Sequence, residues 1–144
     1  MESPSVRITH VEEFSASHRL HNPELSDAEN ERIFGICNNA HGHGHNYELA
    51  VTIEGVPDAL TGMVMNLNDL MNILRERVIS LVDHKHLNHD VEFMRGLVPT
   101  AENIAIAIWQ QIEPQLADFK SCRLQSVKLN ESKSNYVEYL GPHR

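Results

Sequence analysis

Cysteine, positive charge and long apolar runs are all scarce in this sequence, and each shortage excludes a class of protein. Two cysteines, Cys37 and Cys122, provide no disulfide framework, so we expect both to be reduced thiols in a cytoplasmic protein. The longest apolar run, residues 104–109, is too short to cross a bilayer, and the N-terminal MESPSVRITH lacks the apolar region of a secretory signal. The formal net charge of −8 argues against nucleic acids or anionic membranes as partners, because a basic surface attracts those.

The sequence does contain enough apolar residues for a core, and it contains unusually many histidines. With 144 residues, of which 41% are hydrophobic, we expect a single domain over residues 1–144. Ten residues are histidine. Two short windows hold six of them, and two more precede both windows: His41, His43, His45, His84, His86 and His89, then His18 and His21. Such clustering favours a chemical role over a random surface composition.

The hydrophobic pattern predicts four strands and two helices in the order ββααββ. The predicted strands cover residues 6–18, 45–54, 123–131 and 135–140. Apolar spacings of three and four predict one helix over 67–81, N-capped by Asn66, and a second that begins at Thr100 and ends at Pro114. We expect the polar residues 22–40 to form a long loop with about one helical turn. The result is an α+β fold with a four-stranded antiparallel sheet and two helices on one face, whose open face and edges favour oligomerisation.

His43 and His45 enclose a glycine at the entrance to the second predicted strand. Residues two apart in a strand point to the same face, so both imidazoles can converge on one ion, and Gly44 allows close backbone approach. His18, on the neighbouring strand, would complete a three-histidine site with its fourth position open, as in a catalytic rather than a structural zinc site. His41 offers an alternative pair with His43, but His45 lies nearest to the strand, so we favour His43 and His45.

Cys37 and the Asp83–His84 pair are the remaining candidate chemical groups. Cys37 lies among glycine and asparagine residues, which are poor neighbours for a buried thiol. Close to a dication its pKa would fall, and the thiolate would act as a base or nucleophile, or instead as a zinc ligand. His84 ends the first predicted helix, where it either complements the helix dipole or is held by Asp83 for proton transfer. Taken individually, Glu102 and Glu131 are interpreted as solvated carboxylates.

Several segments carry a more specific pattern when they are taken together. They are FSASHRL at 14–20, FGICNNAHGHGHNYEL at 34–49, TGMVMNLNDL at 61–70, LVDHKHLN at 81–88, PTAENIA at 99–105 and the segment around Glu131. In this order, and over nearly the whole chain, they resemble the 6-pyruvoyl-tetrahydropterin synthase family. The resemblance implies a tunnelling fold (T-fold), assembled as a homohexamer of two stacked trimers with active sites at subunit interfaces.

The same resemblance implies a role for each candidate residue. It places zinc on His18, His43 and His45, and it makes Cys37 the catalytic proton acceptor.

A second group of residues would handle the substrate. Asp83 and His84 match the family's second acid–base pair, and Glu131 matches the carboxylate that anchors the pterin and joins the proton relay with His84. Thr100 and Glu102 match the segment that also touches the pterin ring.

The reaction implied by the resemblance converts 7,8-dihydroneopterin triphosphate into 6-pyruvoyl-tetrahydropterin and inorganic triphosphate, a carbon–oxygen lyase step of tetrahydrobiopterin biosynthesis. Mg²⁺ bound to the triphosphate would offset its repulsion by an acidic protein. A bacterial relative, 6-carboxytetrahydropterin synthase of queuosine biosynthesis, uses the same substrate and also releases acetaldehyde. The carboxy enzymes place three residues between the cysteine and the first histidine, and the pyruvoyl enzymes five; here Cys37 to His41 satisfies the first and Cys37 to His43 the second. Because a fold does not fix a function, a pterin- or metal-binding module without catalysis and a structural zinc protein stay open as well.

Overall fold

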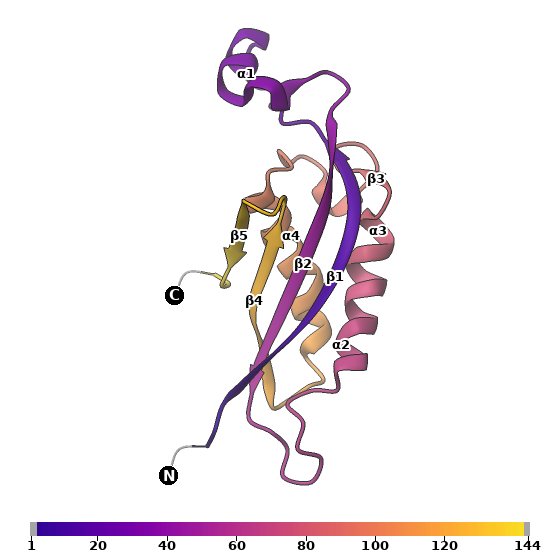
Figure 1. The fold of residues 1–144 in the computed structure, drawn as a ribbon, viewed down its shortest axis with the longest axis vertical. Coiled ribbons are helices and arrows are strands. Elements are labelled where there is room, and N and C mark those ends of the chain that lie inside the picture. Colours follow the sequence, from indigo (N-terminus) through magenta and orange to yellow (C-terminus); the bar gives the residue numbers. More distant parts are fainter. Residues whose placement is uncertain (1–2, 143–144) are drawn as a thin grey trace.

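Two long strands form the spine of the fold (Figure 1). β1 (Val6–His18) and β2 (His43–Gly55) pair antiparallel along their whole lengths, so that His18 lies opposite His43. Burial alternates along both strands, because one face of the sheet packs on helices and the other does not. The computed structural model describes residues 3–142.

Three further strands complete a sheet in the order β3-β1-β2-β4-β5. β4 (Cys122–Asn130) pairs antiparallel with β2, and β5 (Tyr136–Tyr139) pairs antiparallel with β4. β3 (Lys85–His86) pairs parallel with β1. The α+β class and the four antiparallel strands are confirmed, but the predicted total of four strands was wrong. A strand of two residues is too short to show any periodicity in the sequence.

The first predicted helix is present but is not a continuous α-helix. α2 (Leu67–Leu74) runs through a π-helical turn at Arg75–Ile79 into α3 (Ser80–Val82). The side chain of Asn66 caps its start by accepting a hydrogen bond from the backbone N–H of Asn68, as predicted. Apolar periodicity does not distinguish α from π geometry over five residues, which explains why the interruption was missed.

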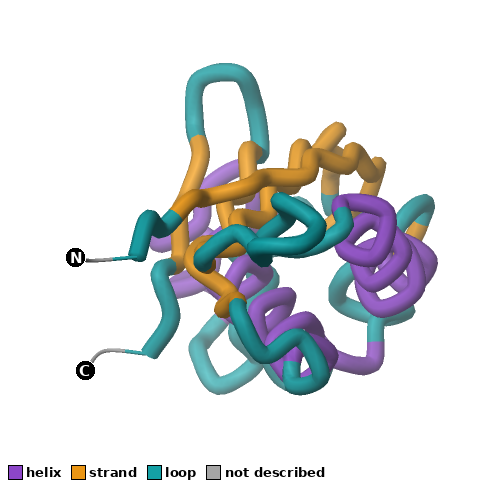
Figure 2. The backbone as a smooth tube through the Cα atoms, turned by 90° about the horizontal axis from the view of Figure 1, so that it is seen from below, coloured by secondary structure: helices purple, strands orange, loops and turns teal. Residues whose placement is uncertain are grey.

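The second predicted helix is α4 (Ala101–Ile112). Thr100 caps it by accepting from the backbone N–H of Asn103, and Pro114 lies in the 3₁₀ turn Glu113–Leu116 that follows. Figure 2 shows the strands as one layer, with the main helices on one side of it. Within residues 3–142, no helix combines the length and the apolar character that a membrane span requires.

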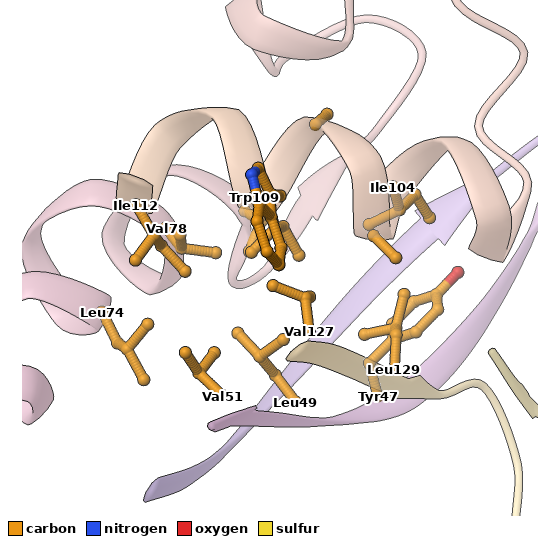
Figure 3. Packing of buried hydrophobic residues seen from close by; sticks show 14 of the residues in the cluster. Tyr47, Leu49, Val51, Leu74, Val78, Ile104, Trp109, Ile112, Val127 and Leu129 are labelled. Atoms are coloured by element: carbon orange, nitrogen blue, oxygen red, sulfur yellow. The ribbon is translucent and has the colours of Figure 1, made fainter. Parts of the chain in front are cut away.

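The hydrophobic core lies between the sheet and the helices (Figure 3). Inward-facing side chains of β2 and β4 meet those of α4 and of the π-helical turn. Fully buried examples are Leu49, Val51, Val127, Leu129, Ile104, Ile112 and Val78. Each contributes about 1.5–3 kcal/mol by leaving water, so this layer of contacts holds β2 and β4 against the helices.

Residues 22–40, predicted to be mostly loop, contain a full helix. α1 (Asp27–Phe34) is followed by a 3₁₀ turn at Gly35–Asn38, and Figure 1 shows it standing beyond the end of the sheet. Ser26 and Glu29 form a reciprocal capping box at its start. The prediction was wrong because this helix has no strong apolar stripe and is held by capping and by a buried polar side chain, Asn30.

Candidate metal centre and adjoining pockets

Three histidines converge where β1 ends and β2 begins. His18 and His43 are register partners, and His45 lies two residues further along the same face of β2. One ring nitrogen from each lies within 4.8 Å of those of the other two. His41, in the turn before β2, is exposed and lies outside this group. Strand pairing therefore brings together the three histidines that were favoured from the sequence.

The ring of His18 is oriented by a backbone carbonyl. Its Nδ1 lies 2.7 Å from the carbonyl oxygen of Pro99, so Nδ1 carries the proton and donates, and the lone pair is left on Nε2. That Nε2 lies 3.2 Å from Nε2 of His43. Two nitrogens bound to one tetrahedral zinc at about 2.0–2.1 Å would be about 3.3–3.4 Å apart, so this spacing suits a shared ion.

His45 adds an unsatisfied nitrogen to the group. Its Nε2 is buried and has no hydrogen-bond partner among residues 3–142. Oε1 of Glu131 lies 3.8 Å away, which is beyond hydrogen-bonding distance. A buried ring nitrogen without a partner costs free energy unless something binds it. The donor set and this orphaned atom fit a divalent metal ion.

The electrostatics keep two of these rings neutral. Burial lowers the pKa of His18, and the neighbouring His43 and His45 lower it further, although the bond to Pro99 acts in the opposite direction. Burial also lowers the pKa of His45, against a smaller rise caused by Glu131. Neutral imidazole is the form that binds metal, so the site is prepared for an ion at neutral pH.

Cys37 lies in the 3₁₀ turn after α1 and is half-buried. Its carbonyl accepts a hydrogen bond of 2.9 Å from the N–H of Leu20, two residues after His18. Its sulfur is not part of the group of converging ligand atoms, so the geometry does not favour a thiolate ligand. The second thiol, Cys122, contacts the carbonyl of Phe119 at 3.5 Å, and burial raises its pKa.

The side chains of Asp83 and His84 contact each other beside β1. His84 Nδ1 lies 3.0 Å from Asp83 Oδ2, while Asp83 Oδ1 accepts from the N–H of Ser15 at 2.9 Å. This backbone bond is the main cause of the lowered pKa of Asp83. His84 has a φ of 61°, a left-handed conformation that costs about 1–3 kcal/mol in a non-glycine residue. The pairing and the strain together indicate that the fold holds this imidazole in a defined position.

The imidazole of His84 opens to solvent, with 82% of its side chain exposed. It lines a groove of about 500 Å³ that also touches His45. Ser15, Ser17 and Asn46 line the same groove from the sheet face that the helices do not cover.

A separate pocket brings together the residues assigned to the pterin. Thr100, Glu102 and Glu131 all line a cavity of about 410 Å³. Leu20, Ile33, Phe34 and Tyr136 add apolar and aromatic surface to it. Two carboxylates in a partly apolar pocket suit a flat heterocycle with several N–H donors.

Comparison with known proteins gives the same picture over the whole chain. The family model described as 6-pyruvoyl tetrahydropterin synthase matches residues 7–142. The chain belongs to this family. The 6-pyruvoyl tetrahydrobiopterin synthase of Drosophila melanogaster is 44% identical over 142 residues, which cover 99% of this chain and 83% of the relative. The human protein of the same name is 46% identical over 128 residues, 89% of this chain and 86% of the relative.

A solved structure extends the agreement to three dimensions. The 6-pyruvoyl tetrahydropterin synthase of Caenorhabditis elegans superposes with a TM-score of 0.91 at 40% identity, covering 99% of this chain and all of the other. The T-fold expected from the resemblance is therefore confirmed. A relative named 6-carboxy-5,6,7,8-tetrahydropterin synthase, from Rickettsia typhi, is 30% identical over 112 residues, 67% of this chain and 80% of the relative.

In this 6-pyruvoyl tetrahydropterin synthase family member, the sequence did not predict the groups that contact the candidate metal ligand His18. The Pro99 carbonyl orients His18, and the hydroxyl of the fully buried Tyr47 lies 3.4 Å from the same Nδ1. Burial raises the pKa of Tyr47, so it stays protonated. Tyr47 lies two residues after His45 on the same strand face, which was a usable signal. Pro99 acts through its backbone carbonyl, which gives no signal in the sequence.

Proposed function

We propose that the chain is a zinc-dependent 6-pyruvoyl tetrahydropterin synthase. It would convert 7,8-dihydroneopterin triphosphate to 6-pyruvoyl-tetrahydropterin and release triphosphate by carbon–oxygen bond cleavage. The main support for this proposal is the convergence of His18, His43 and His45, with a buried ring nitrogen that lacks a partner within the described residues. Three imidazoles leave a coordination position open, which favours catalytic zinc over a structural ion. Family membership supports an enzyme acting on a pterin.

The proposed metal would supply Lewis acidity toward the hydroxyls of the substrate side chain. The remaining chemistry belongs to the chain's own residues. Cys37, tethered through its carbonyl two residues beyond His18, would accept a carbon-bound proton. His84, whose Nδ1 is held by Asp83, presents Nε2 for a second proton transfer.

Glu131 and Glu102 would orient the pterin. Both line the same cavity with Thr100, and ionised carboxylates accept hydrogen bonds from amino and ring N–H groups. Glu131 also lies 3.8 Å from His45, so the bound ring would lie close to the metal site. Mg²⁺ accompanying the triphosphate would reduce its repulsion by a chain of net charge −8.

The expected homohexamer is also a proposal, and the sheet supports it. β1 is paired with β3 only at Ala16 and Ser17, so most of that edge is unpaired within the described chain. β5 forms the opposite edge of the sheet. Open edges of this kind pair with other strands. His84 faces the open side, where a neighbouring subunit would complete an interfacial site in a cytoplasmic enzyme.

The competing product, 6-carboxytetrahydropterin, rests on the three-residue spacing between Cys37 and His41. In the structure His41 lies outside the ligand group, which uses His43 and His45. The greater identity to the pyruvoyl relatives also favours the pyruvoyl product.

Product analysis tests the proposal directly. Purified protein loaded with zinc is incubated anaerobically with dihydroneopterin triphosphate and Mg²⁺, and the products are identified by mass spectrometry. We expect 6-pyruvoyl-tetrahydropterin and triphosphate. 6-Carboxytetrahydropterin with acetaldehyde would establish the carboxy enzyme, and binding without turnover would establish a pterin-binding module. A His43→Ala variant is the matched blank for contaminating activity.

A further inference from the structure

A side chain continues the β1–β3 pairing past the end of both strands. The backbone N–H of Leu87 still donates to the carbonyl of Ser17 at 2.8 Å. The next residue, Asn88, turns its amide toward the backbone of Arg19. Its Oδ1 accepts from the Arg19 N–H at 2.8 Å, and its Nδ2 donates to the Arg19 carbonyl at 2.8 Å. This two-way exchange is the pattern of a β-bridge, with a side chain in place of one strand.

The residues that follow β1, Arg19 and Leu20, are also hydrogen-bonded to the turn that carries Cys37. Arg19 Nε donates to the carbonyl of Asn38 at 2.9 Å, and the Leu20 N–H donates to the carbonyl of Cys37 at 2.9 Å. Asn38 Nδ2 donates in return to the carbonyl of Leu20 at 2.9 Å. Three hydrogen bonds thus join the two residues after β1 to the turn that carries the thiol.

The last residue of β1 is held by different contacts. The backbone of His18 pairs with His43, and its ring bonds the carbonyl of Pro99. Removing the amide of Asn88 would therefore loosen the backbone at Arg19, to which the turn that carries Cys37 is hydrogen-bonded, while the contacts of His18 are kept.

We propose that Asn88 is a positioning residue that fixes the Cys37 thiol relative to the three-histidine site. The inference rests on the proposed function, in which that thiol accepts a substrate proton. An amide is suited to the task because it supplies one donor and one acceptor in the spacing of a backbone unit. An aspartate keeps the acceptor for the Arg19 N–H and loses the donor. Displacing a reacting group by about 1 Å costs up to about a hundredfold in rate, so the loss of both bonds should be visible in turnover.

The experiment compares Asn88→Ala and Asn88→Asp with a matched control, Asn68→Ala, on the exposed face of α2. For each full-length protein we would measure kcat and KM with dihydroneopterin triphosphate, and zinc affinity by chelator competition. The alkylation rate of Cys37 by iodoacetamide is followed by peptide mapping, with Cys122 as the internal reference.

We expect kcat of Asn88→Ala to fall about tenfold to a hundredfold, with KM and zinc affinity within about threefold of wild type. The alkylation rate of Cys37 should change at least about threefold while that of Cys122 stays constant, because only Cys37 lies in the turn that is joined to Arg19 and, through it, to Asn88. Asn88→Asp should fall between wild type and Asn88→Ala in both readouts.

Equal kcat and equal Cys37 alkylation in Asn88→Ala and Asn68→Ala would overturn the inference. So would a parallel loss of zinc affinity and kcat, since Asn88 would then support His18 instead. If Asn88→Ala does not fold, Asn88→Asp, which keeps one bond, decides by the same readouts. If the wild-type protein shows no turnover, the proposed function fails; the alkylation comparison still decides whether Asn88 positions the thiol.

Discussion

The rings of His18 and His43 lie edge to face with centroids 4.7 Å apart, on residues that are direct partners in the β1–β2 register. A slip of one residue would turn one ring to the opposite face of the sheet. The candidate metal centre therefore takes its geometry from strand pairing rather than from a loop.

Removing a histidine of this group should remove the metal. Residues that only hydrogen-bond to a metal ligand contribute about 10–100-fold to metal affinity, and a ligand itself contributes more. His43→Ala is therefore expected to lower zinc affinity by more than about a hundredfold. His41→Ala is the matched control, because that exposed residue lies outside the group. Chelator competition gives both affinities, and an equal loss in the two variants would contradict the assignment.

Replacing the thiol should separate chemistry from metal binding. Cys37→Ala is expected to keep its zinc, because its sulfur lies outside the ligand group, and to lose about 10²–10⁴-fold in kcat as a proton acceptor. Metal content by mass spectrometry and steady-state kinetics would be measured on the same sample. Cys122→Ser should keep normal turnover. Loss of zinc from Cys37→Ala would instead make Cys37 a ligand.

Zinc affinity should be nearly constant at and above neutral pH. Burial lowers the pKa of His18 and of His45, so these rings remain neutral below the usual value of about 6.5. Affinity is then expected to change little between about pH 8 and pH 7 and to fall in more acidic solution, as protons compete for the nitrogens. The metal-free protein should also lose stability as the pH drops below about 6.5, because the unfolded chain takes up protons first. Titration calorimetry and urea denaturation across this range would test both trends, and a steep loss of affinity above about pH 7 would contradict them.

Asn30 should be the main polar support of α1. Its side chain is fully buried, accepts from the N–H of Asn22, and donates to the carbonyls of Asn22, Leu25 and Ser26. Asn30→Ala removes these four side-chain hydrogen bonds and leaves the N–H of Asn22 without its acceptor, at about 1–3 kcal/mol, while the carbonyls of Asn22 and Ser26 keep their backbone donors. Because α1 stands beyond the sheet, we expect faster hydrogen exchange confined to that segment. Asn72→Ala, exposed on α2, is the control, and unchanged exchange in α1 would argue against this role.

The parts of the fold that follow a simple period were predictable from the sequence. Alternation along β2 placed His43 and His45 on one face, and apolar spacing located α4 together with its cap at Thr100. The parts that were missed depend on contacts between distant segments. β3 exists because two N–H groups reach the carbonyls of Ser15 and Ser17, and such pairing leaves no period in its own residues.

The reactive side chains of the candidate site could be predicted from the sequence, but the groups that orient them could not. Histidine, cysteine and carboxylate side chains have chemical roles that spacing can suggest. The carbonyl of Pro99 and the amide of Asn88 act on ring or backbone atoms of residues far away in the chain, His18 and Arg19. Only the folded chain shows them.

The three histidines of the candidate centre and Cys37 come from one uninterrupted stretch: the end of β1, the α1 segment and the start of β2. The helices that pack on the sheet come later. The histidine group and the thiol are thus encoded close together, whereas Asp83, His84 and Glu131 come from later segments. Evolution or a protein engineer can alter the excursion between the two long strands, and with it the chemistry, while the remaining architecture is left almost untouched.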